Sequence, residues 1–370
     1  MPICWWPPKV ISKGYTTFLF LVVHVSALYQ PLPAAAQAAF SGLDVATRQR
    51  ELERCVADLP GGFTTKTVKG RTYWYYQLKN PAGSVTQIYL GPDEPPIREL
   101  IAAHGDGLRH AGAQAIKSMA RAAIEYGCTP IPAAHGRVID RLSDYGFFRA
   151  GGMLVGTHAF IAYQNHFGVR WVGGAMTLDL DFAHAGKNLS IAMQSDVRVD
   201  TRGALESLQM GFIPVVSQTT YKKPDEPDFD IDFLTSMGRR GDAPVHIPAL
   251  NVTLQPLRFM ELSMESPLPA SLLLRSGSIA VNVPRPERYA LHKLIVSQLR
   301  PMEMRLKASK DIAQAAHLLD YLLTEDADLV TEIWNDVVAR GKSWESKLKG
   351  GLASLCRAFP DQGFDQRLAL

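Results

Sequence analysis

The chain has 370 residues, of which 46% are hydrophobic and 20% charged, which are ordinary proportions for a folded protein and unlike those of a disordered chain. At about 150 residues per domain, this length predicts two or three domains. Lys and Arg number 39 against 36 Asp and Glu, a net charge of +3. So small an excess creates no global field that would draw the protein onto nucleic acid or a membrane, but it does not exclude a local basic patch.

The first 39 residues carry a pattern typical of a secretory signal. Lys9 and Lys13 precede the apolar run 16–28, and the small residues 33–36 follow it. The run is shorter than the ~20 apolar residues of a transmembrane helix. A buried strand or helix, or a start codon placed too far upstream, would explain the same apolar run. We therefore treat 1–39 as either an N-terminal extension or a signal-like segment. Four scattered cysteines without a C-x-x-C pair suit a reducing compartment, so we expect a cytoplasmic protein with no stable membrane span.

Residues 40–128 predict a helix followed by a β-ribbon region, a shape that winged-helix modules share. A helical pattern over 40–60 ends at Pro60-Gly61-Gly62, and strands are expected at 63–68, 72–77 and 86–90. The aromatic run in the second strand either stacks on nucleic-acid bases or, more commonly, packs as a sheet face on a helix. After a short acidic-proline linker, residues 97–126 predict one long helix.

The remaining chain divides into a mixed region and a helical region. Over 129–284 short apolar strands alternate with helices, and over 285–370 Leu, Ile and Ala recur at helical spacing. The predicted fold class is therefore α+β, with a small mixed β-sheet core, the N-terminal helix and β-ribbon region, and a C-terminal helical bundle.

A strand, a small-residue turn and a helix follow one another at 153–167. Gly156 and Thr157 form the turn, which exposes backbone N–H groups at a helix N-terminus and so offers a site for phosphate. Thr157 is expected to cap the helix or to bind a phosphate oxygen. Most turns of this kind bind nothing, so the motif needs support from its surroundings.

Two acidic strands supply that support. In Thr177–Phe182 apolar residues alternate with Asp179 and Asp181, so both carboxylates lie on one face. In the second strand, 229–235, Asp230 and Asp232 alternate with apolar residues in the same way. If the two strands pair, three carboxylates meet, and three carboxylates holding two Mg²⁺ ions are suited to nucleotidyl transfer. Alternatively, each acidic face is an exposed edge or one half of surface ion pairs.

Basic residues in the C-terminal helices provide candidate phosphate ligands. Lys293 and Arg300 are two helical turns apart and so share a face, and Lys310-Asp311 follows on the next helix. If the helices pack over the acidic strands, Lys293, Arg300 and Lys310 would bind a triphosphate. A solvated basic face explains the same spacing.

The Gly156-Thr157 turn, the Asp179-x-Asp181 pair and the later Asp232 together resemble the nucleotidyltransferase (polymerase-β-like) superfamily. A bacterial family of uncharacterised nucleotidyltransferase-fold proteins is similar to the wider runs 151–183, 221–235, 288–300 and 307–315, and this resemblance covers roughly residues 60–325. The C-terminal helices resemble those of AbiEii-type toxin nucleotidyltransferases. Thr replaces the usual Ser in the turn, and the spacing from Gly156 to Asp179 is long enough to require an extra element between them.

The resemblance implies a role for each matching residue. Gly156 and Thr157 would cradle the β- and γ-phosphates, and Asp179 and Asp181 would bind both Mg²⁺ ions. Asp232 would be the third carboxylate and a base for the acceptor hydroxyl, with Asp230 as the alternate. The AbiEii-type likeness implies that one lysine binds the triphosphate and that a basic-Asp pair completes the site; the matching residues are Lys293, Lys310 and Asp311.

Three functions are compatible with these observations. The first is Mg²⁺-dependent transfer of a nucleoside monophosphate from an NTP to an acceptor hydroxyl on RNA, protein or a small molecule. The second is a non-catalytic nucleic-acid-binding or regulatory protein, and the third a glycosyltransferase that uses D-x-D to hold a nucleotide sugar. The sequence does not choose among ATP, CTP, GTP and UTP, and it leaves the acceptor, the oligomeric state and membership of a toxin–antitoxin pair open.

Overall fold

The computed structural model describes residues 27–53, 61–79, 85–105, 108–173, 179–185, 199–215, 217–238 and 241–368. The signal-like run, apart from its last two residues, lies outside these ranges, as do Cys4 and Cys55. Cys128 and Cys356 are free thiols. Within the described ranges, none of the helices combines the length and the apolar character needed to cross a bilayer.

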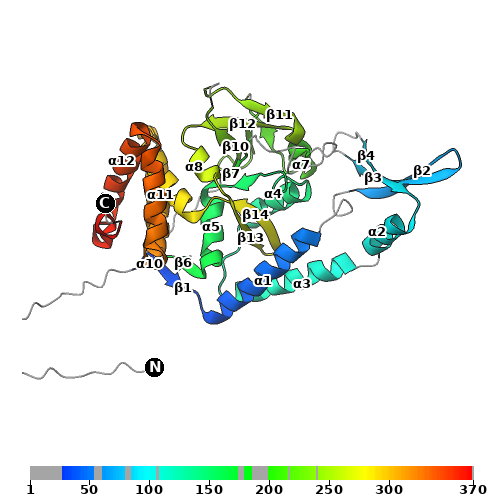
Figure 1. Ribbon diagram of the computed structural model, residues 1–370, viewed down its shortest axis with the longest axis horizontal. Helices are drawn as coiled ribbons and strands as arrows, with labels where there is room; N and C mark the ends of the chain where they lie inside the picture. The colour runs from blue at the N-terminus through cyan, green and yellow to red at the C-terminus, as the bar shows by residue number, and fades with distance from the viewer. Residues whose placement is uncertain are drawn as a thin grey trace, which may run out of the picture.

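A mixed β-sheet forms the centre of the fold (Figure 1). In the described part of the chain its main strand order is β11-β12-β10-β7-β5, and β9 pairs with β10 and with β8. β10 runs parallel to β7 and β12 and antiparallel to β9, while β5 is antiparallel to β7. The strands are β5 (Met153–Leu154), β7 (Leu180–Ala183), β8 (Ile213–Pro214), β9 (Thr220–Lys222), β10 (Asp230–Ser236), β11 (Val245–Ile247) and β12 (Val252–Leu257).

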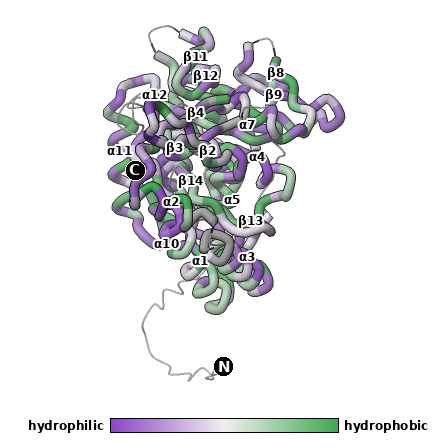
Figure 2. The backbone as a smooth tube through the Cα atoms, turned by 90° about the vertical axis from the view of Figure 1, so that its right-hand side faces the viewer, coloured by the Kyte–Doolittle hydropathy of each residue, from purple (hydrophilic) through white to green (hydrophobic). Residues whose placement is uncertain are grey.

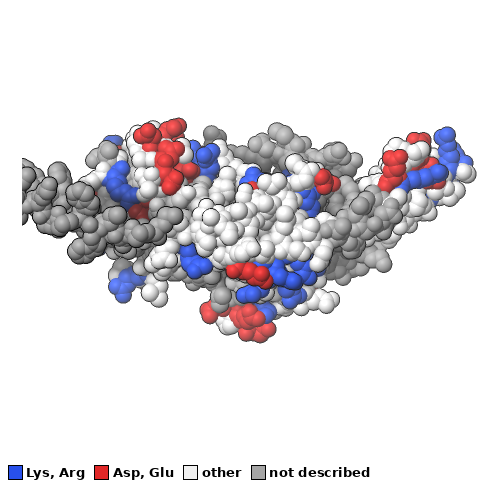
Figure 3. Space-filling view, turned by 90° about the horizontal axis from the view of Figure 1, so that it is seen from below, with Lys and Arg blue, Asp and Glu red and all other residues white. Residues whose placement is uncertain are grey.

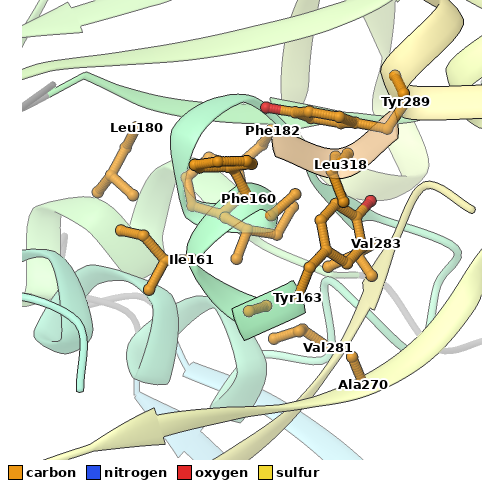
Figure 4. Close-up of a cluster of buried hydrophobic side chains, with 14 of the residues drawn as sticks. Phe160, Ile161, Tyr163, Leu180, Phe182, Ala270, Val281, Val283, Tyr289 and Leu318 are labelled. Atoms are coloured by element: carbon orange, nitrogen blue, oxygen red, sulfur yellow. The ribbon is translucent and has the colours of Figure 1, made fainter. Parts of the chain in front are cut away.

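Helix α5 (Gly156–Phe167) lies at the heart of the hydrophobic core (Figure 4). Its apolar residues contact β7 on one side and the hairpin of β13 (Leu268–Leu274) and β14 (Gly277–Val283) on another. Nine of its 12 residues are buried, including the polar residues Thr157, His158, Gln164 and Asn165, in keeping with a central position. Figure 2 shows the same contrast between this mainly hydrophobic interior and the alternating hydrophilic and hydrophobic residues of the outer helices.

The C-terminal helices pack on this core rather than forming a separate one. One buried hydrophobic cluster extends from Ile131 to Leu368 and includes residues of the sheet, α5 and the helices after it. The predicted helical character of the region beyond residue 285 is confirmed. The helices are α9 (Pro286–Ser297), α10 (Arg305–Glu325), α11 (Ala327–Ala339), α12 (Lys342–Ala358) and α13 (Phe364–Arg367). Shorter helices in the core region are α4 (Ala133–Asp144), α7 (Thr201–Ser207) and α8 (Glu261–Met264), with single 3₁₀ turns at Pro248–Leu250, Met302–Met304 and Pro360–Gln362.

The N-terminal part joins the core through β1 (Tyr29–Pro31) and through helices α1 (Ala34–Glu53) and α3 (Leu108–Glu125). β1 pairs antiparallel with β6 (Val169–Trp171), which is the extra element required between Gly156 and Asp179. Helices α1 and α3 pack together and against Leu273 of the hairpin. The helix predicted from residue 40 therefore begins six residues earlier, inside the segment that we treated as an extension.

A three-stranded antiparallel sheet extends from one end of the molecule (Figure 1). Its strands are β2 (Gly62–Val68), β3 (Arg71–Lys79) and β4 (Val85–Pro92), which confirms the predicted ribbon. The prediction of one helix over 97–126 is wrong, because α2 (Pro95–Gly105) and α3 are separate. Apolar residues recur at helical spacing on both sides of residues 105–107, but the sequence Gly105-Asp106-Gly107 contains two glycines, which favour ending a helix.

Candidate active site

Two carboxylates from distant parts of the sequence lie side by side in the central sheet. Strands β7 and β10 are parallel neighbours, and their register places Asp181 opposite Asp232. The residues that follow these two acids, Phe182 and Phe233, are fully buried on the opposite face and stack at a ring-centroid distance of 5.5 Å. The predicted pairing of the two acidic strands is confirmed, and the alternation that predicted it also explains why the carboxylates share one face.

Gly156 brings the start of helix α5 directly against Asp181. Its backbone φ is +61°, a conformation that L side chains rarely adopt, and a Cβ atom at this position would overlap the Asp181 carboxylate. The N-cap residue of α5 is Val155, and no side chain caps this end of the helix. Thr157 is therefore inside the helix and is not its cap, contrary to one of the two predicted roles.

Side chains from α10 contact the Gly156-Thr157 turn. The Thr157 hydroxyl is buried and accepts hydrogen bonds from Lys310 Nζ (3.5 Å) and Gln314 Nε2 (3.4 Å). The Tyr289 hydroxyl lies 2.9 Å from the Gly156 carbonyl oxygen and 2.9 Å from Gln314 Oε1, so α9 and α10 are both tied to the turn. Burial lowers the pKa of Lys310, with a further contribution from the charge of Lys293.

Asp179 comes immediately before β7 and forms an ion pair with α10. Its Oδ2 lies 3.4 Å from Lys307 Nζ, and the ion pair is partly exposed. The alternate carboxylate, Asp230, is paired with Lys222 of β9 at 2.9 Å. Asp230 therefore already has a cationic partner on its neighbouring strand, whereas Asp232 has a hydroxyl partner, Thr220 Oγ1, at 2.5 Å.

Asp311 organises the cations that the sequence predicted as phosphate ligands. Its side chain is fully buried (0% exposed) and accepts from Lys293 Nζ (2.6 Å) and Arg300 Nε (3.1 Å). Burial works against the charged carboxylate, but the two cations outweigh it and hold the pKa of Asp311 below its ordinary value. The acidic partner of Lys293 and Arg300 is thus fixed in the core, and both cations border the pocket described next.

A pocket of about 280 Å³ opens beside Asp181 and Gly156 and is lined by α9, the end of β12 and the segment after α9. Three cationic side chains, Arg258, Lys293 and Arg300, border it together with apolar residues such as Leu257 and Val296. A cationic and apolar pocket next to two carboxylates is suited to a ligand that combines phosphates with a less polar group.

Asp181 and Asp232 meet the electrostatic requirement of a cation site. Burial raises the pKa of Asp181, and the charge of Asp179 adds to this effect against nearby lysines. Burial also raises the pKa of Asp232 to about 6; the Thr220 hydrogen bond lowers it, and Asp181 and the other carboxylates raise it. Within the described ranges, however, no three His, Cys, Asp or Glu side chains are already gathered around a point that a metal ion would occupy. The donor chemistry fits Mg²⁺, but the third ligand would have to move into place.

Two buried histidines, one from α4 and one from the first turn of α5, form a pair. His135 Nδ1 and His158 Nε2 are 2.8 Å apart, and both rings are almost inaccessible to solvent. Burial lowers the pKa of both, that of His158 to about 3 with the charges of His135 and Lys310 contributing, so two neutral imidazoles share one hydrogen bond. The pair supports the start of α5 from within the core.

Sequence reasoning missed several residues of this site. Lys307 and Gln314 lie on α10 at spacings that mark them only as polar positions of a helix, and Arg258 comes from a turn after β12. Tyr289 is one of many aromatic residues that fit a hydrophobic core. Only the folded arrangement of α9 and α10 over the sheet brings these residues to the carboxylates.

Comparison with known proteins identifies the family. A family model described as Nucleotidyltransferase matches residues 133–339, which is more than half of the chain and includes the acidic strands, the turn and helices α9 to α11. No curated protein and no solved structure matches the chain. The α+β fold with C-terminal helices agrees with the family. The chain therefore belongs to this nucleotidyltransferase family and is an enzyme with a nucleotide substrate.

Proposed function

We propose that the protein transfers a nucleoside monophosphate from an NTP to an acceptor hydroxyl, with two Mg²⁺ ions held by Asp179, Asp181 and Asp232. The observation that carries this proposal is the register of the parallel strands β7 and β10, which sets Asp181 beside Asp232 next to Gly156. Bound Mg²⁺ would neutralise charge on the reacting phosphates and favour ionisation of the attacking hydroxyl.

The chain's own groups have distinct roles in this reaction. The acceptor oxygen forms a bond to the α-phosphorus, the bond from that phosphorus to the bridging oxygen breaks, and pyrophosphate leaves. Asp232 would accept the proton of the acceptor hydroxyl, because it lies opposite Asp181 at the proposed metal site and its partner is a hydroxyl rather than a cation. Asp230 is less suited to this role, since Lys222 already neutralises it.

The phosphates of the NTP would occupy the cationic side of the pocket. Lys293 and Arg300 border the pocket while their other contacts fix them on Asp311, so both cations are held in place before the ligand binds. The N-terminal backbone N–H groups of α5 add the favourable end of the helix dipole, and Lys310 contacts the turn at Thr157. In this arrangement Asp311 is a positioning residue.

The test is a transfer assay with each of the four α-labelled NTPs, Mg²⁺, and RNA, protein or small-molecule acceptors. A binding assay with a fluorescent NTP needs no acceptor and runs in parallel. Asp181→Asn should lower transfer at least about 100-fold, because it removes the carboxylate shared by both proposed metals. Asp225→Asn is the matched control, since the Asp225 side chain is 72% exposed and lies outside the pocket.

Two outcomes would contradict the proposal. One is the absence of transfer and of Mg²⁺-dependent binding with all four NTPs. The other is full activity of Asp232→Asn with a nucleotide sugar as donor, which would favour a glycosyltransferase, because that reaction has no need of a third carboxylate.

The proposal extends to a toxin-like role in a cytoplasmic bacterial protein. It is supported by the similarity of the C-terminal helices to AbiEii-type toxins and by the ion pair of Lys293 with Asp311 on adjacent helices. Induced expression in bacteria should arrest growth, and Asp181→Asn should abolish the arrest at equal protein level. Equal growth of cells that express either protein or neither would contradict this extension.

A further inference from the structure

The antiparallel sheet of β2, β3 and β4 has two chemically different faces. On one face Phe63 contacts Trp74 and Tyr76 edge to face, with ring centroids 6.5 Å and 5.0 Å apart, and Tyr76 is fully buried. Trp74 Nε1 also donates to Asp93 Oδ1 at 3.0 Å, just before helix α2. This face is therefore an ordinary packed sheet face.

Three tyrosines gather on the other face, which we call the tyrosine face (Tyr73, Tyr75 and Tyr89). Tyr75 lies opposite Tyr89 in the register of β3 and β4, with ring centroids 5.4 Å apart, and the rings of Tyr73 and Tyr89 are 6.2 Å apart. The ammonium group of Lys66 lies 4.8 Å from the centre of the Tyr75 ring. Tyr89 is 55% exposed, although nothing in the folding of a small sheet requires a large aromatic ring in water.

The charge of this sheet is unlike that of the rest of the protein. Residues 62–92 contain four Lys and Arg and no Asp or Glu, so this short segment carries more net positive charge than the whole chain, +3. Lys66, Lys69 and Arg71 lie at the hairpin end and are exposed. Figure 3 shows basic and acidic side chains together at the corresponding end of the molecule, with Lys and Arg at its outermost edge. The first acidic residue after this segment is Asp93, which is paired with Arg98.

We infer that the tyrosine face binds single-stranded nucleic acid. An exposed ring, Tyr89, beside the half-buried rings of Tyr73 and Tyr75 in a cationic surface is suited to unpaired bases, which stack on the rings while the phosphates contact Lys and Arg. A duplex keeps its bases stacked on each other and so offers nothing to the tyrosines. The proposed binding does not depend on the transfer reaction, because the face lies outside the pocket and contains none of its residues.

The test measures binding of labelled 12-nucleotide RNA and DNA strands, and of the matching duplex, to the full chain by fluorescence anisotropy. Tyr89→Ala and Tyr75→Ala should each weaken binding about 5- to 100-fold, because base stacking on an aromatic ring is lost. Tyr89→Phe should keep most of the affinity, since the ring remains. Tyr126→Ala is the matched control, because Tyr126 is 53% exposed at the end of α3.

Charge is tested separately through the salt dependence of binding. Lys66→Ala should reduce the slope of log affinity against log salt by about 1, while Lys117→Ala, on the exposed side of α3, should leave it unchanged. Binding of single strands supports the proposal whether RNA binds more tightly than DNA or equally, and the comparison shows whether the face prefers RNA. Failure to bind either strand, equal or tighter binding of the duplex, or unchanged affinity of folded Tyr75→Ala and Tyr89→Ala variants would overturn it.

Discussion

The carboxylate of Asp232 is the side chain whose surroundings change its chemistry most clearly. It is half-buried, lies opposite Asp181 in the sheet and accepts a hydrogen bond from the Thr220 hydroxyl. These surroundings favour the protonated form and raise its pKa from 3.8 to about 6. A group with such a pKa costs stability at neutral pH unless a cation binds beside it.

Asp232→Asn should stabilise the metal-free protein at pH 7.5. The folded state binds the Asp232 proton more tightly than the unfolded state, so wild-type stability falls as pH rises from about 4 to about 6 and stays lower above that range. The Asn side chain of the variant does not titrate. Its free energy of unfolding should therefore exceed that of wild type by about 1–3 kcal/mol at pH 7.5. Urea denaturation in EDTA at several pH values measures the difference.

The pH profile provides the control for this effect. Below pH 4 the advantage of Asp232→Asn should disappear, because both states of the wild type are then protonated at this position. Asp225→Asn, on an exposed side chain, should show no pH-dependent gain. A stability difference that is constant from pH 4 to pH 7.5 would contradict the raised pKa.

The sequence contains enough information to predict the carboxylates but not their partners. The alternation around Asp181 and Asp232 fixes which side of a strand faces the core, because burying Phe182 and Phe233 leaves the acids on the other side. No such local rule places Lys307 or Gln314, since their roles arise from how α10 crosses the sheet.

Close contact between α9 and α12 illustrates what determines helix packing in this protein. Gly351 of α12 lies against the backbone of Leu294 in α9, and a Cβ atom there would overlap the Leu294 carbonyl oxygen and Cβ. Gly351 is buried, so the two helices approach more closely than side chains would allow. Since Lys293 belongs to α9, this contact also helps to fix the position of the pocket.

Gly351→Ala should destabilise the protein by about 1–3 kcal/mol, because the added methyl group pushes α12 away from α9. Gly350→Ala is a matched control on the same helix, since its added Cβ would meet only the flexible end of Gln298 at 3.0 Å. The control should be neutral or stabilising by up to about 1 kcal/mol, from the higher helix propensity of Ala. Equal denaturation midpoints for the two variants would contradict the close-packing explanation.

Element types were more predictable than element limits. Periodicity identifies α5, α9 and the acidic strands, because a buried face must repeat with the period of the element. It fails at residues 97–126, where apolar spacing runs across two helices, and at β1, whose three residues form a strand only because β6 lies beside them. Long-range pairing of this kind leaves no local pattern in a short segment.

At the scale of the whole molecule, Asp320 of α10 connects the two ends of the described chain. Its Oδ2 accepts from the backbone N–H of Leu28 at 2.8 Å, and its Oδ1 accepts from Arg367 Nη1 at 2.5 Å. Arg367 also donates to the Asp320 carbonyl oxygen at 2.8 Å. Because Asp320 is only 5% exposed, these contacts are shielded from water and stronger than those of a surface ion pair.

Asp320→Ala should therefore loosen both ends of the chain at once. The substitution leaves the Leu28 N–H without its acceptor and Arg367 without its carboxylate, which predicts a loss of about 2–4 kcal/mol in the free energy of unfolding. Glu332→Ala, which removes an exposed acid from α11, should stay within about 0.5 kcal/mol of wild type. Hydrogen exchange should show faster exchange in β1 and in α13 of the Asp320 variant, with α5 protected until the protein unfolds globally. Faster exchange in only one of β1 and α13 would mean that Asp320 does not couple these two elements, because a shared carboxylate must release both when it is removed.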